Sequence, residues 1–204
     1  MNETISAEEA QAILYPQRAR KLAACIQGGW GKWEEFGKRA PDLRIPLSAS
    51  ARALMVHNHI TDLARKEFAD DPGVHVGDNR GFLVLTFEDR VVVRFKKYRS
   101  RRFRTSNIPT RQQLQFSYQL QLPGMPAEST RLVAGYLLDE LETSIQTIAV
   151  TCSIGPELQW MLDISGEADT EDDVLEPPTP QDGSRAPRVG PKPGERRDEE
   201  DGQS

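Results

Sequence analysis

The chain has 204 residues, with 26 Lys or Arg against 31 Asp or Glu, a formal net charge of −5, and only 2 cysteines. It has no apolar run near the ~20 residues of a membrane-spanning helix, and too few Cys and His for a disulfide-stapled secreted domain or a zinc finger. Residues 1–12 are polar and acidic, unlike a secretory signal, so we expect a cytoplasmic protein that does not associate with membranes.

The C-terminal segment, residues 166–204, differs in composition from the rest of the chain. It holds 12 acidic and 5 basic residues, and Val174, Leu175 and Val189 are its only aliphatic residues larger than alanine. So little apolar surface cannot offset an ordering cost of roughly 1–2 kcal/mol per residue, which predicts a disordered acidic tail. Residues 1–165 then carry 21 basic and 19 acidic residues, a net charge of +2.

The N-terminal third of the chain predicts helices. Ser6 with Glu9 three residues later is a capping-box pattern, which indicates a helix start. Pro16 fits a second helical start or a kink, and we expect the helix that follows to stop at Gly28-Gly29. A further helix is expected from about residue 48 to residue 68, because its apolar residues recur every three or four positions.

After residue 73 the apolar pattern changes to a period of two, which is typical of strands. The expected strands are 74–76, 82–87, 90–98, 132–139 and 144–152, and the apolar piece 158–164 is a strand or a helix. Short turns or a single crossover connect these pieces. We therefore expect one α+β domain over residues 5–165, with N-terminal helices packed on an antiparallel sheet of about five strands.

The segment 111–122 supports two interpretations. Polar and apolar residues alternate from Gln113 to Leu122, which by period alone indicates a strand. The segment contains no Val, Ile or Thr, however, and Thr110 followed by Gln113 is another capping-box pattern, with a stop at Pro123-Gly124. We favour the helix.

The most distinctive local feature is a basic segment, residues 90–111, that contains nine basic residues and no acidic one. Aromatic residues are interleaved with the basic ones, a combination that can neutralise phosphates and stack on bases, or contact an acidic protein. The alternative is that the charges only protect the edge of a sheet. The candidate binding residues are Arg90, Arg94, Lys96, Lys97, Tyr98, Arg99, Arg101, Arg102, Phe103, Arg104 and Arg111.

Catalytic and metal-binding patterns are weak. His57 and His59 lie two apart on a predicted helix and point in nearly opposite directions, so they cannot hold one ion together. Cys25 and Cys152 fit core positions better than activated thiols. A metal-dependent nuclease would need convergent carboxylates, whereas the acids near the basic segment sit in turns. We expect no catalytic residue, no metal and no cofactor.

Several short motifs carry a resemblance to a known family. They are Arg94–Lys97, Ser106–Thr110 with Gln112-Gln113, Gln119 to Leu122-Pro123-Gly124, and Gly135-Tyr136. Over residues 50–164 the chain resembles an uncharacterised bacterial family found near genes for ImmA/IrrE-type metallopeptidase regulators, often in mobile elements. The resemblance implies a partner or regulator, and the chain lacks the H-E-x-x-H helix of the peptidase itself.

These observations together predict a non-catalytic binding or regulatory protein. We expect a bacterial protein partner, in a mobile-element or toxin–antitoxin-like setting, with the basic segment as the contact surface. Direct nucleic-acid binding through the same segment is the alternative, and a metal-dependent nuclease comes third. The sequence leaves the oligomeric state open.

Overall fold

The computed structural model describes residues 4–79, 81–105 and 110–166. The helices are α1 (Ala7–Leu14), α2 (Gln17–Arg39), α3 (Pro41–Arg44), α4 (Ala49–Glu67) and α5 (Arg111–Ser117). The strands are β1 (Val74–Asn79), β2 (Phe82–Phe87), β3 (Val91–Lys97), β4 (Thr130–Leu138), β5 (Ile145–Ile154) and β6 (Glu157–Asp163). The expected tail lies, apart from Gly166, outside the described residues and stays a prediction.

The predicted helix starts are confirmed. The Glu9 backbone N–H donates to Ser6 Oγ at 3.2 Å, and the Ser6 N–H donates to the Glu9 carboxylate at 2.9 Å, which completes the capping box of α1. Helix α2 begins directly after Pro16, and Ser48 caps α4 by accepting a hydrogen bond from the Ala51 N–H at 3.1 Å. These side chains satisfy backbone donors that a helix start leaves unpaired.

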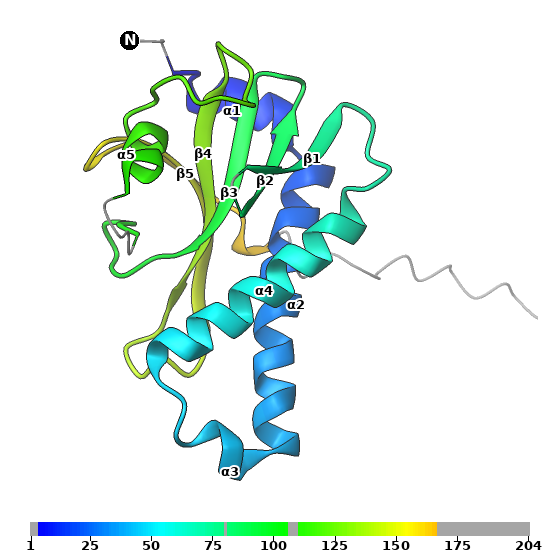
Figure 1. Cartoon of the computed structure of the whole chain (residues 1–204), viewed down its shortest axis with the longest axis vertical. Helices are drawn as coiled ribbons and strands as arrows, with labels where there is room; N and C mark the ends of the chain where they lie inside the picture. The colour runs from blue at the N-terminus through cyan, green and yellow to red at the C-terminus, as the bar shows by residue number, and fades with distance from the viewer. Residues whose placement is uncertain (1–3, 80, 106–109, 167–204) are drawn as a thin grey trace, which may run out of the picture. The chain divides into compact units, whose positions relative to one another are not determined.

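The predicted stop at Gly28-Gly29 is wrong, because α2 continues without a break to Arg39. Helices α2 and α4 cross in Figure 1, and both glycines face α4, Gly28 toward Leu63 and Gly29 toward Ile60. A Cβ on Gly29 would overlap Ile60 Cγ1 and would lie 3.0 Å from the Ile60 backbone nitrogen. The glycines therefore allow the two helices to pack closely, and this tertiary contact outweighs the helix-breaking tendency of glycine.

The strands form one six-stranded sheet in the order β1-β2-β3-β4-β5-β6. The α+β architecture is confirmed, and the apolar piece 158–164 is the sixth strand, β6. One pairing differs from the expected antiparallel sheet, because β3 and β4 are parallel. The long crossover between them, residues 98–129, returns the chain to the starting end of β3, so β4 runs in the same direction.

The sheet has two differently covered faces. Helices α1, α2 and α4 cover one face and bury alternate strand residues such as Leu85, Val93 and Val150 in the main core. The crossover covers part of the other face, where Phe116 and Leu122 pack on Val92. Figure 1 shows α5 on the side of the strands opposite α2. Within the described residues, no helix combines the length and apolar character needed to span a bilayer.

The helix favoured for 111–122 is confirmed over Arg111–Ser117, where Thr110 Oγ1 accepts a hydrogen bond from the Gln113 N–H at 3.2 Å. The helix ends earlier than expected, before Gln119, whose φ is 57°. The Gln119 side chain is instead inserted into the sheet, donating to the backbone oxygens of Arg131 at 2.8 Å and Ser153 at 3.0 Å. These hydrogen bonds fix the crossover against β4 and β5.

Candidate functional site

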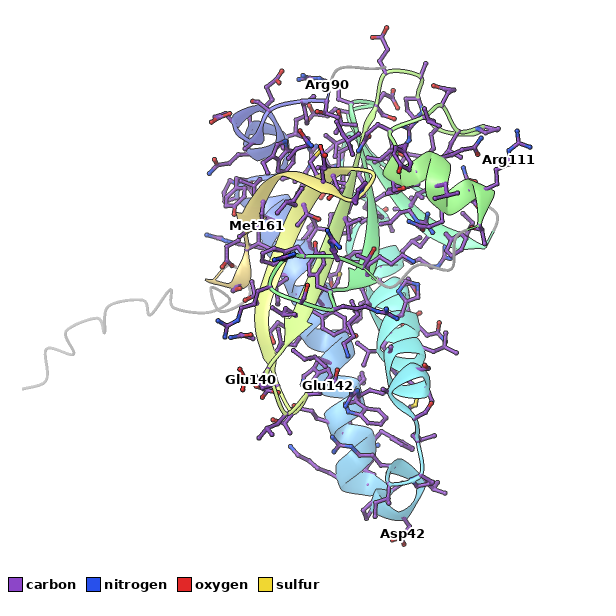
Figure 2. The ribbon with its side chains drawn as sticks, turned by 90° about the vertical axis from the view of Figure 1, so that its left-hand side faces the viewer. Asp42, Arg90, Arg111, Glu140, Glu142 and Met161 are labelled. Carbon is purple, nitrogen blue, oxygen red and sulfur yellow. The ribbon has the colours of Figure 1, made fainter. Side chains whose placement is uncertain are left out.

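The basic segment does not form one continuous surface. Arg90 lies in the turn between β2 and β3 and pairs with Glu9 at 3.0 Å, and Lys97 pairs with Glu142 at 2.6 Å. Figure 2 shows Arg90 and Glu142 at opposite ends of the sheet and Arg111 on the outer side of α5. Two of the predicted binding residues, Arg90 and Lys97, thus already pair with carboxylates of this chain. These two pairs lie far apart.

Arg94 is a buried residue, with a side chain that is only 3% exposed. Its guanidinium lies 4.1 Å from the Phe82 ring centre and 4.8 Å from the Phe116 ring centre. Burial lowers the pKa of Arg94 to about 10, so the group stays charged at neutral pH. The rings compensate this charge by cation–π attraction, and Arg94 therefore supports α5 rather than presenting charge to a partner. Lys96 is half-buried beside it, and burial, followed by the Arg94 charge, lowers the pKa of Lys96.

The aromatic residues of the basic segment are also largely inaccessible. Phe95 lies in the core beneath the helices. Tyr98 is buried on the other face, where its hydroxyl lies 2.9 Å from the Val133 carbonyl oxygen and 3.0 Å from Thr151 Oγ1. Phe103 packs edge-to-face on Tyr98 with ring centres 5.2 Å apart. Phe95 and Tyr98 are thus too buried for base stacking, and Phe103 is partly buried against Tyr98.

Between Tyr98 and Thr105 the chain forms a closed loop, residues 99–104, which we call the arginine loop. The Arg99 N–H donates to the Arg104 carbonyl oxygen at 2.8 Å, and the Phe103 N–H donates to the Ser100 carbonyl oxygen at 2.8 Å. Four exposed arginines project from this loop: Arg99, Arg101, Arg102 and Arg104. None of the four forms an ion pair with any residue that the structure describes. Hydrogen bonds thus hold the loop in shape, and its four arginines form no ion pair with a carboxylate among the described residues.

The arginine loop separates two hollows. The larger, of about 500 Å³, lies between the loop, the start of α4 and the β4–β5 hairpin, and we call it the mixed-charge hollow. Arg99 and Arg101 line it together with Glu140 and Glu142. Because its acidic side chains face its basic ones, this hollow offers no net attraction for a charged ligand.

The second hollow, of about 190 Å³, lies between the loop, α5 and the turn after β5, and we call it the basic hollow. Arg102 and Arg104 line it from the loop, and Arg131 lines it from β4. Its described lining residues include no acid. The positive charges that meet here come from two separate parts of the chain.

Arg131 is the functional candidate that sequence reasoning missed. Its side chain is 1% exposed, and its Nε, Nη1 and Nη2 have no hydrogen-bond acceptor among the described residues. Its backbone is fixed, since its N–H donates to Gln119 Oε1 at 2.8 Å. A buried charge of this kind is destabilising by several kcal/mol unless something compensates it. The one signal in the sequence is a basic residue directly before the apolar run Leu132–Leu138.

The residues considered for metal binding and nucleophilic chemistry do not come together. No group of three His, Cys, Asp or Glu side chains able to hold a metal ion exists within residues 4–79, 81–105 and 110–166. Burial raises the pKa of Cys25 to about 12 and that of Cys152 to about 11, so both are protonated thiols at neutral pH. Neither thiol has the thiolate character that nucleophilic catalysis requires.

Comparisons with protein-family models, with curated proteins and with solved structures find no match to this chain. The arginine loop and the two hollows beside it are therefore the candidate functional site of the described residues.

Proposed function

We propose that this protein is a non-catalytic binding protein that docks an acidic region of a protein partner on the arginine loop. The observation that carries the proposal is the set of four exposed arginines, held on a hydrogen-bonded loop without carboxylate partners among the described residues. Arginines on a preordered loop lose little conformational freedom on binding, and their guanidinium groups match carboxylates in bidentate pairs.

Apolar side chains near the loop favour a protein partner. Leu114 and Tyr118 on and after α5 are 45% and 46% exposed, and Leu158 on β6 is 40% exposed. Leu158 lines the basic hollow together with the loop, and the Tyr118 ring is close to Gly155 on the same rim. Apolar and aromatic contacts surrounded by arginine are typical of protein interfaces.

Nucleic acid is the second candidate, and the same four arginines favour it. Phosphate contacts would then supply most of the affinity, because the rings of Phe95 and Tyr98 are buried and that of Phe103 is partly buried. Such binding would be independent of base sequence. The resemblance to proteins encoded near ImmA/IrrE-type regulators adds the setting of the proposal, a bacterial mobile element or a toxin–antitoxin-like system.

The test compares two double variants of the full chain that remove equal charge. R101A/R102A removes two arginines of the loop, and K38A/R39A removes two cations at the end of α2. The probes are a fluorescent peptide of alternating Glu and Leu and a labelled oligothymidylate, each titrated at several salt concentrations. We expect R101A/R102A to weaken peptide binding about 5- to 30-fold, taking up to ~1 kcal/mol for each exposed pair.

The control variant must not show this loss of binding. K38A/R39A should bind the peptide like the unaltered protein, and equal loss in both variants would show non-specific attraction only. If oligothymidylate binds tighter than the peptide, with log K falling linearly and steeply in log salt, the nucleic-acid candidate replaces the protein partner.

A further inference from the structure

The basic hollow beneath the arginine loop has a floor made by the sheet. Arg131 and Val133 of β4 lie beside Thr151 and Ser153 of β5, all on the face opposite the long helices. Ser117 of α5 adds a hydroxyl group to one wall. The Ser117 hydroxyl already donates to the Leu114 carbonyl oxygen at 3.0 Å, and Thr151 Oγ1 lies 3.0 Å from the Tyr98 hydroxyl, so the guanidinium groups are the main donors that the hollow offers to an oxyanion.

The buried guanidinium of Arg131 is the feature that suggests a ligand for this hollow. It is 1% exposed, its three nitrogens have no acceptor among the described residues, and it lines the hollow together with Arg102 and Arg104. Arginine does not escape the cost of burial by losing its proton, so its charge must be compensated in another way. No carboxylate and no aromatic ring among the described residues provides that compensation.

The size and charge of the hollow define the ligand that fits. A volume of about 190 Å³ corresponds to about six water molecules at roughly 30 Å³ each. It is smaller than the roughly 300–1,000 Å³ of pockets that enclose whole cofactors or drug-sized ligands. A single oxyanion group fits this volume, and three arginines balance the two charges of a phosphate group better than the one charge of a carboxylate.

We propose that the basic hollow is a binding site for one phosphate group, in which Arg131 contacts the phosphate from the floor and Arg102 and Arg104 close over it from the loop. The group is either free phosphate or the end of a phosphate ester that leaves the hollow between these two arginines. This inference goes beyond the proposed function, because Arg131 lies beneath the surface that an acidic partner would contact.

The test measures thermal unfolding of the full chain in phosphate and in chloride at equal ionic strength and pH. At a phosphate concentration about a hundredfold above Kd, we expect Tm to rise by about 5–10 °C over chloride. R131M replaces the buried cation with an apolar side chain of similar length. We expect this variant to unfold in chloride at or above the Tm of the unaltered protein, and to lose the phosphate-dependent rise.

Two neighbouring arginines supply a matched pair of surface variants. Arg102 lines the basic hollow, whereas Arg101 lines the mixed-charge hollow. R102A should reduce the phosphate-dependent rise and R101A should leave it unchanged. Because both side chains are exposed, this pair keeps the test decisive even if R131M does not fold.

The outcomes separate the ligand classes. A larger rise with O-phosphoserine than with inorganic phosphate would assign the site to a phosphate ester, and the reverse would assign it to the free ion. The proposal is overturned if acetate stabilises as much as phosphate, if phosphate acts like chloride, or if R131M retains the rise. Weaker peptide binding by R101A alone, with an unchanged phosphate-dependent rise, tests the proposed function separately, since Arg101 does not line the basic hollow.

Discussion

Replacing Gly29 by alanine tests whether the close crossing of α2 and α4 depends on the missing side chain. The added Cβ would overlap Ile60 Cγ1, and would lie 3.0 Å from the Ile60 nitrogen and 3.1 Å from the Val56 carbonyl oxygen. The last two atoms belong to the backbone of α4, so a rotamer change of Ile60 cannot relieve the whole contact. Overpacking of this kind costs about 1–3 kcal/mol, and backbone contacts favour the upper end of that range.

The helix propensity of alanine acts in the opposite direction and must be subtracted. Alanine is favoured over glycine in a helix interior by about 1 kcal/mol, so we expect G29A to lower the free energy of unfolding by about 2 kcal/mol. For a chain of this length that corresponds to a fall in Tm of about 4–8 °C.

The control variant lies two residues further along the same helix. A Cβ on Gly31 would meet no atom within 4 Å, so G31A gains helix propensity without overpacking. We expect G31A to raise Tm by about 1–4 °C. Thermal unfolding followed by circular dichroism measures both variants. If G29A were as stable as G31A, the explanation of the glycine pair by helix packing would be refuted.

The remaining predictions concern pH and the acidic C-terminal segment. Burial, followed by the charges of Lys96 and Arg94, lowers the pKa of His57, so the unfolded chain takes up a proton that the folded chain does not. We expect the protein to lose stability as pH falls below about 6.5, and Tm measured between pH 7.5 and pH 5.5 should fall less in H57Q. Deleting residues 167–204 should tighten binding of the acidic peptide if this segment competes for the arginine loop; anisotropy titrations that give equal Kd values would exclude such competition.

Local sequence signals predicted most helix starts and strand positions, because these depend on neighbouring residues. Ser6 with Glu9, and Thr110 with Gln113, form their caps within one helical turn. The tight hairpin after Phe87 is equally local, since Glu88 and Asp89 both adopt positive φ there. Such contacts are encoded within four residues and can be inferred without the fold.

The failures come from contacts between distant parts of the chain. Gly28-Gly29 predicted a stop because nothing near it in sequence reveals that Ile60 packs against it. The parallel pairing of β3 with β4 was missed because hydrophobic period gives the position of a strand and not its direction. The basic segment was read as one surface, but the alternation of side chains along β3 sends Arg94 and Lys97 to opposite faces.

The contrast between Arg94 and Arg131 explains why only one of these two buried cations indicates a ligand. They lie on the same face of adjacent strands, since Arg94 is aligned with Val133 and Arg131 with Val92. Burial lowers the pKa of both guanidinium groups, so both bear a desolvation penalty. The Phe82 and Phe116 rings compensate Arg94, and that compensation belongs to the fold itself. Within the part of the chain that the structure describes, Arg131 has neither ring nor acceptor, yet it is placed where Arg102 and Arg104 add to its charge. The described residues thus do not offset the desolvation cost of Arg131. An anion bound in the basic hollow would offset this cost and would explain why three arginines line the same hollow.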